Sequence, residues 1–363
     1  MKLSVTMIVR DEAAMLPGCL ERLGECELVV VDTGSTDATR ELAKAAGARV
    51  FDFTWRDDFA AARNFALEQC TGDVVLVLDA DERVSKELWA QLMALPASVG
   101  AATVLMRNVQ AGGSVRDARL LRVFRRHPSI RYRYAIHEDV SESVRAYVSE
   151  HRLEVAQLGG VIEHLGYTRD VMASKGKRER DQRLLEKHLE VEPTNLYSHF
   201  KLLELARFWA DDVLSRRAAE AAHHVLEHSG PIRHAPWAGE LVVLVGSALW
   251  PKHPREQLAW LEAFSTRITP SAAWQLRRAE LYELLGHFEA SRSAFAACAG
   301  LKDQLGDLQL STVRPRMGLA RLAWAEGKLH EAFGWTRAAL ALAPEDQEAL
   351  FAFGVLREKL GAT

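Results

Sequence analysis

The stretch from Thr71 to Val84, TGDVVLVLDADERV, decides the fold. Within it, Val74 to Leu78 is a continuous apolar run of strand length that ends in Asp79-Ala80-Asp81. A run that is apolar on both faces is typical of a buried strand in a parallel sheet. Such sheets bind ligands in the crevice outside the carboxyl ends of their strands. We therefore expect the acidic tip of this strand to lie in a binding crevice.

Asp79 and Asp81 are two residues apart, so in an extended segment their side chains would point to the same side. Neighbouring carboxylates repel each other unless a cation lies between them, and Mg²⁺ or Mn²⁺ takes oxygen ligands and often bridges to phosphates. The pattern predicts a metal site that holds a nucleotide diphosphate. A polar turn after a strand is the alternative interpretation, and the surrounding sequence favours the site.

Strand and helix patterns alternate along the first part of the chain, with short loops between them. The predicted strands are 3–9, 28–31, 48–53, 74–78, 101–107 and 118–124, and the predicted helices are 11–23, 38–46 and 59–70. This alternation is typical of an α/β domain with a mainly parallel sheet and right-handed crossovers. Asp32, at the end of the second strand, would then face the same crevice as Asp79 and Asp81.

The composition is that of an ordinary globular protein, with 363 residues of which 48% are hydrophobic and 26% charged. This length predicts about two domains, at roughly 100–200 residues each. A net charge of -3 gives no reason to expect nucleic acid, and no apolar run approaches the roughly 18 residues of a membrane span. The four cysteines form no CxxC pair, and the first residues do not read as a secretory signal, so we expect a cytoplasmic protein.

Helical periodicity dominates the chain after Pro193. Two segments share one form: a helix, a glycine, an acid followed by alanine, and a second helix. Their glycines, Gly286 and Gly327, lie 41 residues apart (327 − 286), which fits a tetratricopeptide unit of roughly 34 residues plus an insertion. A more degenerate unit is predicted over 195–229.

These patterns predict two domains, an α/β domain over 1–190 and a helical domain over 191–363. Stacked helical hairpins form a short solenoid that offers a surface for binding. We expect no chemistry in this second domain, and its tryptophans are interpreted mainly as packing residues.

Three stretches of the first domain resemble the family 2 glycosyltransferases, nucleotide-sugar-dependent enzymes of the GT-A fold. They are SVTMIVRDEAAMLPGCL from Ser4, VVVDTGSTDAT from Val29 and WRDDFAAARNFALEQCTGDVVLVLDADE from Trp55. The likeness extends to the bacterial subgroup that joins this domain to tetratricopeptide-type helices, which includes peptide S-glycosyltransferases. The resemblance implies a metal-dependent, inverting hexosyltransferase that uses Mg²⁺ or Mn²⁺. It would move a sugar from a nucleotide-diphosphate sugar, expected to be UDP-linked, to a peptide or protein side chain.

The resemblance also implies roles for single residues. Asp32 corresponds to the acid that accepts a hydrogen bond from a uracil-type base, and Asp81 to the direct metal ligand. The implied nucleotide-binding residues are Val9, Glu12, Asp32, Arg63, Asp79, Ala80 and Asp81, and the implied metal-binding residues are Asp81, Asp79 and His164. The alternative interpretations are a turn aspartate for Asp32, a surface arginine for Arg63 and a structural histidine for His164. Asp11 departs from the family pattern, in which asparagine precedes the glutamate.

The segment 134–140, YAIHEDV, contains the residues expected to act on the acceptor. It is not a zinc-protease HExxH motif, because Ser141 occupies its fifth position. Inverting transfer needs a base that takes a proton from the attacking acceptor, and a carboxylate within hydrogen-bond reach can do this. In the resembling subgroup a His-Glu pair lies near the acceptor. Glu138 is therefore the first candidate for the base, with His137 and Asp139 as alternates, and an ordinary acid at a helix start is the competing interpretation.

Other functions stay open on the sequence alone. The acceptor could be a polysaccharide or a lipid-linked sugar instead of a polypeptide, and the resemblance also allows a homodimer. An Asp-x-Asp phosphohydrolase normally carries its motif on an early strand, whereas here the motif follows the fourth. A non-catalytic repeat scaffold is disfavoured because Asp32, Arg63, Asp79 and Asp81 are all retained.

Overall fold

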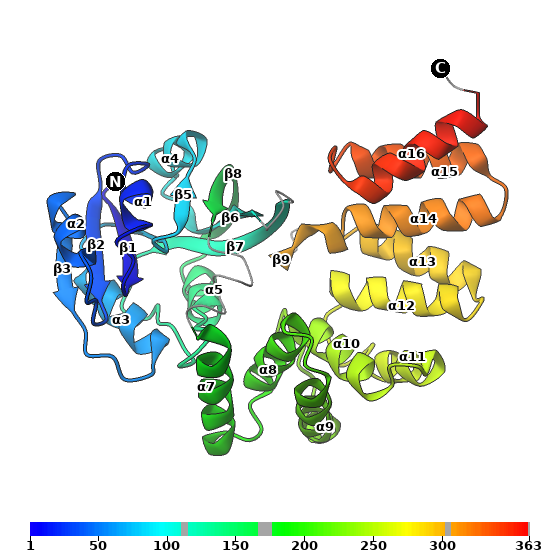
Figure 1. Ribbon diagram of the computed structural model, residues 1–363, viewed down its shortest axis with the longest axis horizontal. Coiled ribbons are helices and arrows are strands. Elements are labelled where there is room, and N and C mark those ends of the chain that lie inside the picture. Colours follow the sequence, from blue (N-terminus) through cyan, green and yellow to red (C-terminus); the bar gives the residue numbers. More distant parts are fainter. Residues whose placement is uncertain (110–114, 166–175, 302–305, 362–363) are drawn as a thin grey trace. The chain divides into compact units, whose positions relative to one another are not determined.

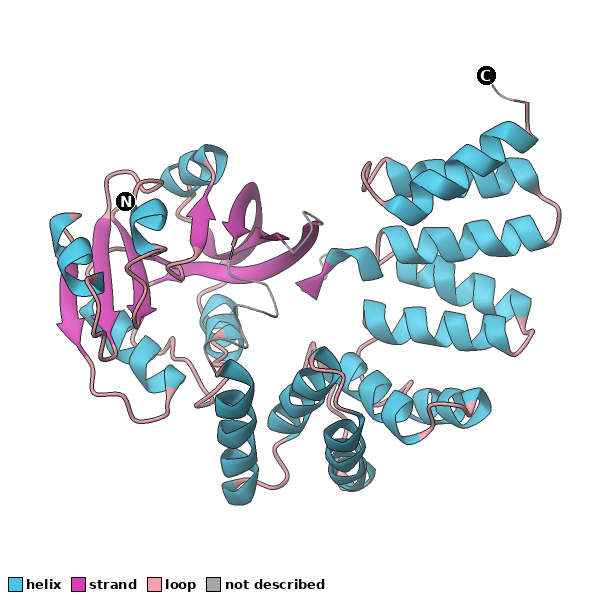
Figure 2. Ribbon diagram, in the orientation of Figure 1, coloured by secondary structure: helices cyan, strands magenta, loops and turns pink. Residues whose placement is uncertain are grey.

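The chain forms two compact units, Met1–Leu184 and Leu185–Thr363. The computed structural model describes residues 1–109, 115–165, 176–301 and 306–361. The division falls inside helix α7 (Lys177–Val191), and the predicted boundary after residue 190 lies near the end of the same helix. Figure 2 shows strands β1 to β8 gathered in the first unit, while the second unit is helical apart from one short strand.

A single mixed sheet forms the centre of the first unit (Figure 1). Its strands are β1 (Leu3–Val9), β2 (Glu27–Asp32), β3 (Arg49–Asp52), β4 (Val74–Val77), β5 (Glu82–Val84), β6 (Val99–Val109), β7 (Val115–Arg125) and β8 (Glu154–His164). They lie in the order β3-β2-β1-β4-β7-β6-β8-β5. Strands β1 to β4 pair in parallel, whereas β7 runs antiparallel to both β4 and β6. The α/β GT-A-like fold predicted from the sequence is thus confirmed.

Apolar runs form the parallel half of the sheet because both of its faces are covered. All four residues of β4 are buried, and alternate side chains enter different cores. Val74 and Leu76 pack in one cluster together with Met7, while Val75 and Val77 pack in another. Each such burial stabilises the fold by roughly 1.5–3 kcal/mol.

The helices of the first unit are α1 (Leu16–Leu20), α2 (Thr39–Ala45), α3 (Phe59–Gln69), α4 (Lys86–Met93) and α5 (Ser141–Glu150). Helix α3 begins where the sequence predicts, because the Asp58 side chain accepts a hydrogen bond from the Ala61 amide at 2.8 Å and caps the helix. Helix α1 is shorter than the predicted 11–23. Asp11 has a positive φ of 52°, which is incompatible with a right-handed helix, and Pro17 is confined to the first turn.

Strands β5 and β8 are absent from the sequence prediction. Strand β5 has only three residues. Strand β8, EVAQLGGVIEH, mixes apolar residues with glycines and charged residues, and its buried positions alternate with more exposed ones only from Leu158 on. They pair with each other antiparallel, and β8 also pairs with β6 in parallel. The resulting sheet is therefore more mixed than the mainly parallel sheet expected.

The second unit consists of helical hairpins. Its helices are α8 (Leu196–Phe208), α9 (Asp212–His228), α10 (Ala238–Leu249), α11 (Pro254–Ala263), α12 (Ala272–Leu284), α13 (Phe288–Ala299), α14 (Val313–Ala325), α15 (Leu329–Leu340) and α16 (Gln347–Lys359), with a two-residue strand β9 (Gly306–Asp307) and a 3₁₀ turn η1 (Leu308–Leu310). Gly286 and Gly327 have φ values of +78° and +75° and end α12 and α14, as glycines in the left-handed region commonly do. The tetratricopeptide-like prediction is confirmed, and the α10–α11 hairpin, which lacks such a glycine, is an addition to it.

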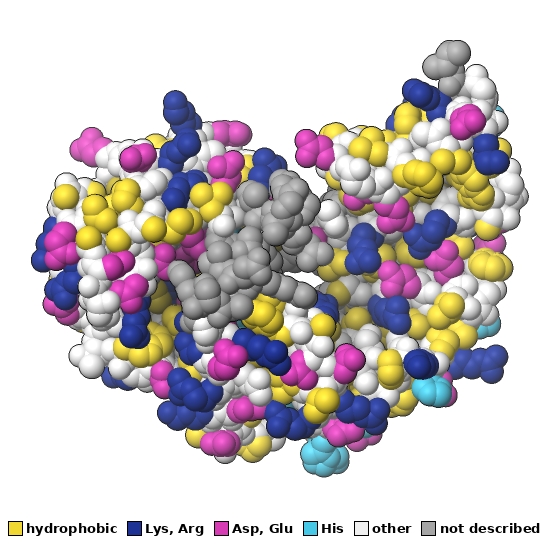
Figure 3. Space-filling model, viewed as in Figure 1, with side chains coloured by type: hydrophobic (Ala, Val, Ile, Leu, Met, Phe, Trp, Pro, Cys, Tyr) yellow, Lys and Arg dark blue, Asp and Glu magenta, His cyan; other side chains and the backbone are white. Residues whose placement is uncertain are grey.

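The visible surface carries charges of both signs. Lysine and arginine side chains alternate with aspartate and glutamate over the face drawn in Figure 3, in keeping with the small net charge. Among the described residues, no helix is both long enough and apolar enough to cross a lipid bilayer.

Candidate functional site

The carboxyl ends of three parallel strands bring the predicted residues to one edge of the sheet. The β1–β2 register places Val9 beside Asp32, and β1 also pairs with β4, whose last residue Val77 precedes Asp79 by two positions. Parallel strands end at the same edge, which is where α/β sheets bind their ligands. Asp32 and the Asp79–Asp81 turn therefore belong to one edge, as predicted.

Asp32 is buried, and one of its two carboxylate oxygens has no hydrogen-bond partner among the described residues. Its Oδ1 accepts hydrogen bonds from the amides of Gly34 at 3.0 Å and Ser35 at 2.9 Å. Gly34 has a φ of +108°, which a glycine adopts without strain. Oδ2 is buried and has no hydrogen-bond partner among the described residues. Since an unpaired buried acceptor costs about 1–3 kcal/mol, this oxygen is placed to receive a donor from a ligand.

Hydrogen bonds join the loops after β1 and β2 beside Asp32. Asp11 donates its amide to Ser35 Oγ at 3.0 Å and accepts from the Thr36 amide at 2.7 Å. The hydrogen bond from the Thr36 backbone lowers the pKa of Asp11. The Glu12 amide donates to Thr39 Oγ1 at 2.8 Å. Asp11 thus serves as a loop-fixing acceptor at the position where the family pattern has asparagine.

Val9 and Ala80 take part through their backbones. The Val9 carbonyl accepts from both the amide and the hydroxyl of Thr33. The Ala80 carbonyl accepts from the Arg83 guanidinium at 2.9 Å. These bonds fix the loops at the ends of β1 and β4.

The carboxylates of Asp79 and Asp81 take different partners. Asp79 Oδ1 lies 2.6 Å from Arg63 Nη2, and Oδ2 lies 3.6 Å from Arg122 Nη2. Burial opposes the ionisation of Asp79, but the two guanidinium groups more than compensate and lower its pKa. Asp81 Oδ2 instead lies 3.3 Å from His164 Nε2. Asp79 is therefore paired with Arg63 and Arg122, and Asp81 lies beside His164.

A partly buried chain of alternating charges runs through Asp79. Arg122 Nη2 also lies 2.7 Å from Glu82 Oε1, while Glu82 Oε2 accepts from the Asp79 amide at 2.9 Å. Arg63 Nε donates to Glu138 Oε1 at 3.1 Å. Burial raises the pKa of Glu82 to about 7, although the Arg122 charge opposes this rise. The chain connects the tip of β4 to the segment that contains the predicted base.

Sequence reasoning missed Glu82 and Arg122 as members of this site. Glu82 is the last residue of the quoted LDADE stretch and could have been included on that ground. Arg122 is one of many arginines in a basic segment, and only the pairing of β7 with β4 selects it.

Asp81 and His164 form the part of the site that can hold a metal. His164 ends β8, opposite Glu82 of β5, and its Nδ1 lies 3.0 Å from Asn108 Oδ1. Burial lowers the pKa of His164, but the hydrogen bond and the charge of Asp81 outweigh this effect and raise it. Burial likewise opposes ionisation of Asp81, and the His164 hydrogen bond more than compensates, so the pKa of Asp81 is lowered.

The donor atoms of this pair fit a divalent ion that also binds phosphate. Within the described residues, no group of three or more His, Cys, Asp or Glu side chains is arranged to hold a metal ion. The side chains of Asp81 and His164 are each 22% exposed, so their outer faces are accessible to a ligand. An ion here would take two protein ligands and complete its shell with phosphate oxygens and water, as Mg²⁺ commonly does.

The three candidates for the base lie in a tight loop. Arg133 and Asp139 exchange two backbone hydrogen bonds of 2.9 and 3.0 Å. Asp139 Oδ1 accepts from the Ser141 amide at 3.1 Å, at the start of α5. His137 has a positive φ of 53°. Of the three, Glu138 is the one whose carboxylate reaches the charge chain, through Arg63.

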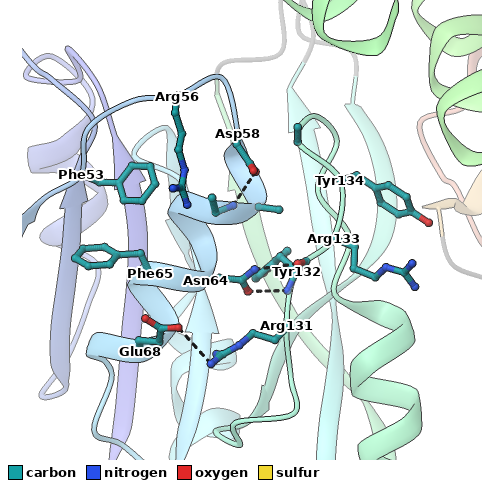
Figure 4. Close-up of a pocket in the computed structure, with 13 residues that line it drawn as sticks. Phe53, Arg56, Asp58, Asn64, Phe65, Glu68, Arg131, Tyr132, Arg133 and Tyr134 are labelled. Carbon is teal, nitrogen blue, oxygen red and sulfur yellow. Dashed lines mark hydrogen bonds and ion pairs between the residues drawn. The ribbon is translucent and has the colours of Figure 1, made fainter. Parts of the chain in front are cut away.

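A separate cavity of about 520 Å³ lies against another face of α3 (Figure 4). It is lined by Phe53, Arg56, Asp58, Ala60, Ala61, Asn64, Phe65, Glu68, Arg131, Tyr132, Arg133, Tyr134 and Ala135. None of the predicted nucleotide, metal or base residues lines it.

Comparison with known proteins assigns the first unit. Residues 4–147 match the family model described as glycosyl transferase family 2. The N-terminal unit is a family 2 glycosyltransferase domain. The matched residues include Asp32, Arg63, Asp79, Asp81 and Glu138, while His164 lies beyond the match.

Curated relatives support this assignment of the family 2 domain. A TPR repeat-containing protein of Synechococcus elongatus is 38% identical over 236 residues, which cover 61% of this chain and 58% of that protein. The lipopolysaccharide core biosynthesis glycosyltransferase LpsC of Rhizobium meliloti is 36% identical over 156 residues, which cover 39% and 56% of the two chains. The SPbeta prophage-derived glycosyltransferase SunS of Bacillus subtilis is 25% identical over 199 residues, or 52% and 45%. The chain thus spans little more than half the length of the first two relatives.

Proposed function

We propose that this protein is an inverting glycosyltransferase that transfers a hexose from a UDP-linked donor to an acceptor. The observation that carries the proposal is the buried, unpartnered Oδ2 of Asp32 at the strand edge of a family 2 domain. The uracil ring presents one imide N–H, and an ionised carboxylate oxygen is purely an acceptor. A uracil base would therefore satisfy this unpaired acceptor.

In this proposal the diphosphate binds between the base site and the Asp81–His164 pair. Asp81 and His164 would hold Mg²⁺ or Mn²⁺, and the bound ion neutralises the charge of the departing diphosphate. Arg63 and Arg122 keep Asp79 and Glu82 paired beneath this edge. These two cations, of which Arg63 is buried and Arg122 partly buried, thereby limit the repulsion between the acidic tip and the phosphates.

Glu138 is the proposed base. Its carboxylate would take the proton from the acceptor nucleophile as that atom bonds to the anomeric carbon and the bond to the diphosphate breaks. Arg63 Nε, 3.1 Å from Glu138 Oε1, keeps this carboxylate oriented. The backbone pairing of Arg133 with Asp139 closes the loop that presents Glu138.

A peptide or protein is the proposed acceptor. The helical repeats of the second unit are of a kind that binds extended partners. A polysaccharide or lipid-linked acceptor is the second candidate, favoured by the 36% identity to LpsC.

Thermal-shift measurements with UDP-, GDP- and TDP-sugars, with and without Mn²⁺, test the proposal. We expect a Mn²⁺-dependent shift with a UDP-sugar in the wild type, and its loss in Asp81→Ala. Glu163→Gln is a matched control, because Glu163 is an exposed acid beside His164 on β8, and it should shift as the wild type does. An equal shift in Asp81→Ala would remove Asp81 from the metal site. The absence of any nucleotide-dependent shift would favour the non-catalytic scaffold. Hydrolysis of a phosphoester without sugar transfer would favour a phosphohydrolase.

A further inference from the structure

Two adjacent residues of α3, Arg63 and Asn64, hold the same segment by independent bonds. The Asn64 amide group donates to the Tyr132 carbonyl at 2.9 Å and accepts from the Tyr132 amide at 2.8 Å. Figure 4 shows Asn64 directed at Tyr132 across the back of the cavity. The side chain thus takes the place of a neighbouring strand and fixes the backbone just before the loop 133–139.

Arg63 holds the far end of this loop. Its Nε donates to Glu138 Oε1 at 3.1 Å, and its Nη2 donates to Asp79 Oδ1 at 2.6 Å. The side chain is only 8% exposed, and its Nη1 is buried without a hydrogen-bond partner among the described residues. A planar guanidinium can make two directed bonds at once, whereas the ammonium group of lysine is a compact point charge. The Arg63 guanidinium therefore joins the carboxylate of Asp79 to the carboxylate of Glu138.

We propose that Arg63 and Asn64 are positioning residues that set the place of Glu138 relative to the donor site. Asn64 fixes the backbone at the entrance to the loop, and Arg63 fixes the carboxylate of Glu138 to Asp79. Arg63 is then the link through which occupation of the donor site reaches the loop. The inference rests on the proposed function, since it takes the edge at Asp81 as the donor site and Glu138 as the base.

This role differs from the expectation, implied by the resemblance, that Arg63 binds the nucleotide. Its guanidinium is already engaged on two sides by carboxylates, and both partners raise its pKa although burial opposes them. A second ion pair provides a control, because it also attaches α3 to the segment before the loop. Glu68 of α3 and Arg131, just before the loop, form a surface ion pair at 3.2 Å that joins the same two segments without touching Glu138.

Hydrogen–deuterium exchange on the full chain without ligand tests the anchoring. In Asn64→Ala and Arg63→Lys we expect the amides of Arg133 and Asp139 to exchange at least about tenfold faster, because local opening becomes easier. Asn64→Asp, which keeps the bond from the Tyr132 amide and loses the other, should lie between Asn64→Ala and the wild type. Glu68→Gln should stay within about twofold of the wild type, since surface ion pairs contribute little.

Exchange in the β1 peptide, residues 3–9, monitors the fold of each variant. An anchoring role requires that β1 stays protected while the loop does not. Wild-type exchange of the loop in Arg63→Lys and Asn64→Ala would overturn the proposal, and so would equal acceleration in Glu68→Gln.

The same measurement with UDP and Mn²⁺ tests the link. We expect the ligand to slow loop exchange in the wild type by about threefold or more, and to leave it unchanged in Arg63→Lys even where a thermal shift shows that UDP binds. Bound UDP without an effect on the wild-type loop would overturn the link. No binding of UDP to the wild type would instead count against the proposed function, and the ligand-free arm would still decide whether Arg63 and Asn64 anchor the loop.

Discussion

At the scale of single residues, Asp32 shows how a turn prepares one atom for a ligand. Its Oδ1 is saturated by the Gly34 and Ser35 amides, and this frees Oδ2 for a donor from outside. Asp32→Asn can keep the first role through its carbonyl oxygen while it places an N–H₂ group where Oδ2 lies. Two donors would then face each other at the imide position.

We therefore expect Asp32→Asn to weaken UDP binding by about 10–100-fold, or roughly 1.4–2.8 kcal/mol. The unliganded protein should stay close to the wild type in stability, because one unpaired buried polar group is exchanged for another. Calorimetric titration of UDP in the presence of Mn²⁺ measures the change. Asp73→Asn is a suitable control, since that carboxylate binds the Lys2 amide at the other end of the sheet. Unchanged affinity in Asp32→Asn would contradict the base contact.

Arg122 is the residue whose loss should damage the first unit most. It is the partner of buried Glu82 and contacts Asp79 as well. Arg122→Met would leave these carboxylates without one of their two cations, so we expect a loss of about 3–5 kcal/mol in the free energy of unfolding. Urea unfolding measures it, with Arg125→Met as the comparison, because the hydrogen bonds of the Arg125 guanidinium to described residues are made to the backbone carbonyls of Val99 and Pro96. A smaller effect in Arg122→Met than in Arg125→Met would contradict the charge chain.

At the scale of elements, Glu27 joins the amino ends of several strands. It begins β2 and accepts hydrogen bonds from Ser4 of β1, from Arg49 of β3 and from Thr71 before β4. Burial opposes its ionisation, but the hydrogen bonds from Ser4 and Thr71 lead the opposing effects and lower its pKa to about 2. The ionised carboxylate therefore holds the sheet together at the edge away from the candidate site.

A folded pKa below the ordinary value means that this stabilisation is present above about pH 4.5 and disappears as the pH falls through about 2. We expect Glu27→Gln to unfold about 2 kcal/mol more easily than the wild type at pH 7. That difference should shrink steadily in urea titrations at pH 4 and pH 3. Glu25→Gln, an exposed neighbour, should show little effect at any pH. A difference that does not depend on pH would show that the charge of Glu27 is not the stabilising feature.

The predicted positions of the elements agree with the structure where the sequence pattern is strong. The prediction missed elements where the pattern is weak. Strand β1 lies at the predicted residues 3–9, because the segment LSVTMIV is rich in apolar and β-branched residues and contains no glycine, proline or charge. The two missed strands, β5 and β8, are held by neighbours: β8 lies between β6 and β5. A short strand such as β5, or one of mixed composition such as β8, is defined by its hydrogen-bonding partners, which a local pattern does not contain.

At the scale of the whole molecule, the two units have separate cores. The clusters around Leu76 and around Val75 belong to the first unit, and those around Phe295 and around Met317 belong to the second. Chains with several cores often unfold in more than one step. We therefore expect two transitions in scanning calorimetry of the full chain.

UDP with Mn²⁺ should raise the midpoint temperature of only one of these transitions. At a ligand concentration of 100 times Kd the gain is about 2.7 kcal/mol, and it belongs to the unit that contains Asp32 and Asp81. Asp81→Ala should abolish the shift and leave the other transition at its wild-type temperature. A single transition that shifts as a whole would show that the two units unfold together.

The sequence by itself determined the parallel strands, the acidic tip at Asp79–Asp81, the turn at Asp32 and the repeat glycines Gly286 and Gly327. These features are local, because apolar runs, strand ends and left-handed glycines are specified by neighbouring residues. Only the tertiary structure decided which charges meet. Asp79 turns to Arg63 and Arg122, Asp81 meets His164, and Glu138 joins Asp79 through Arg63. These partners come from distant parts of the chain, and they meet because the sheet order sets β4 beside β7 and β5 beside β8.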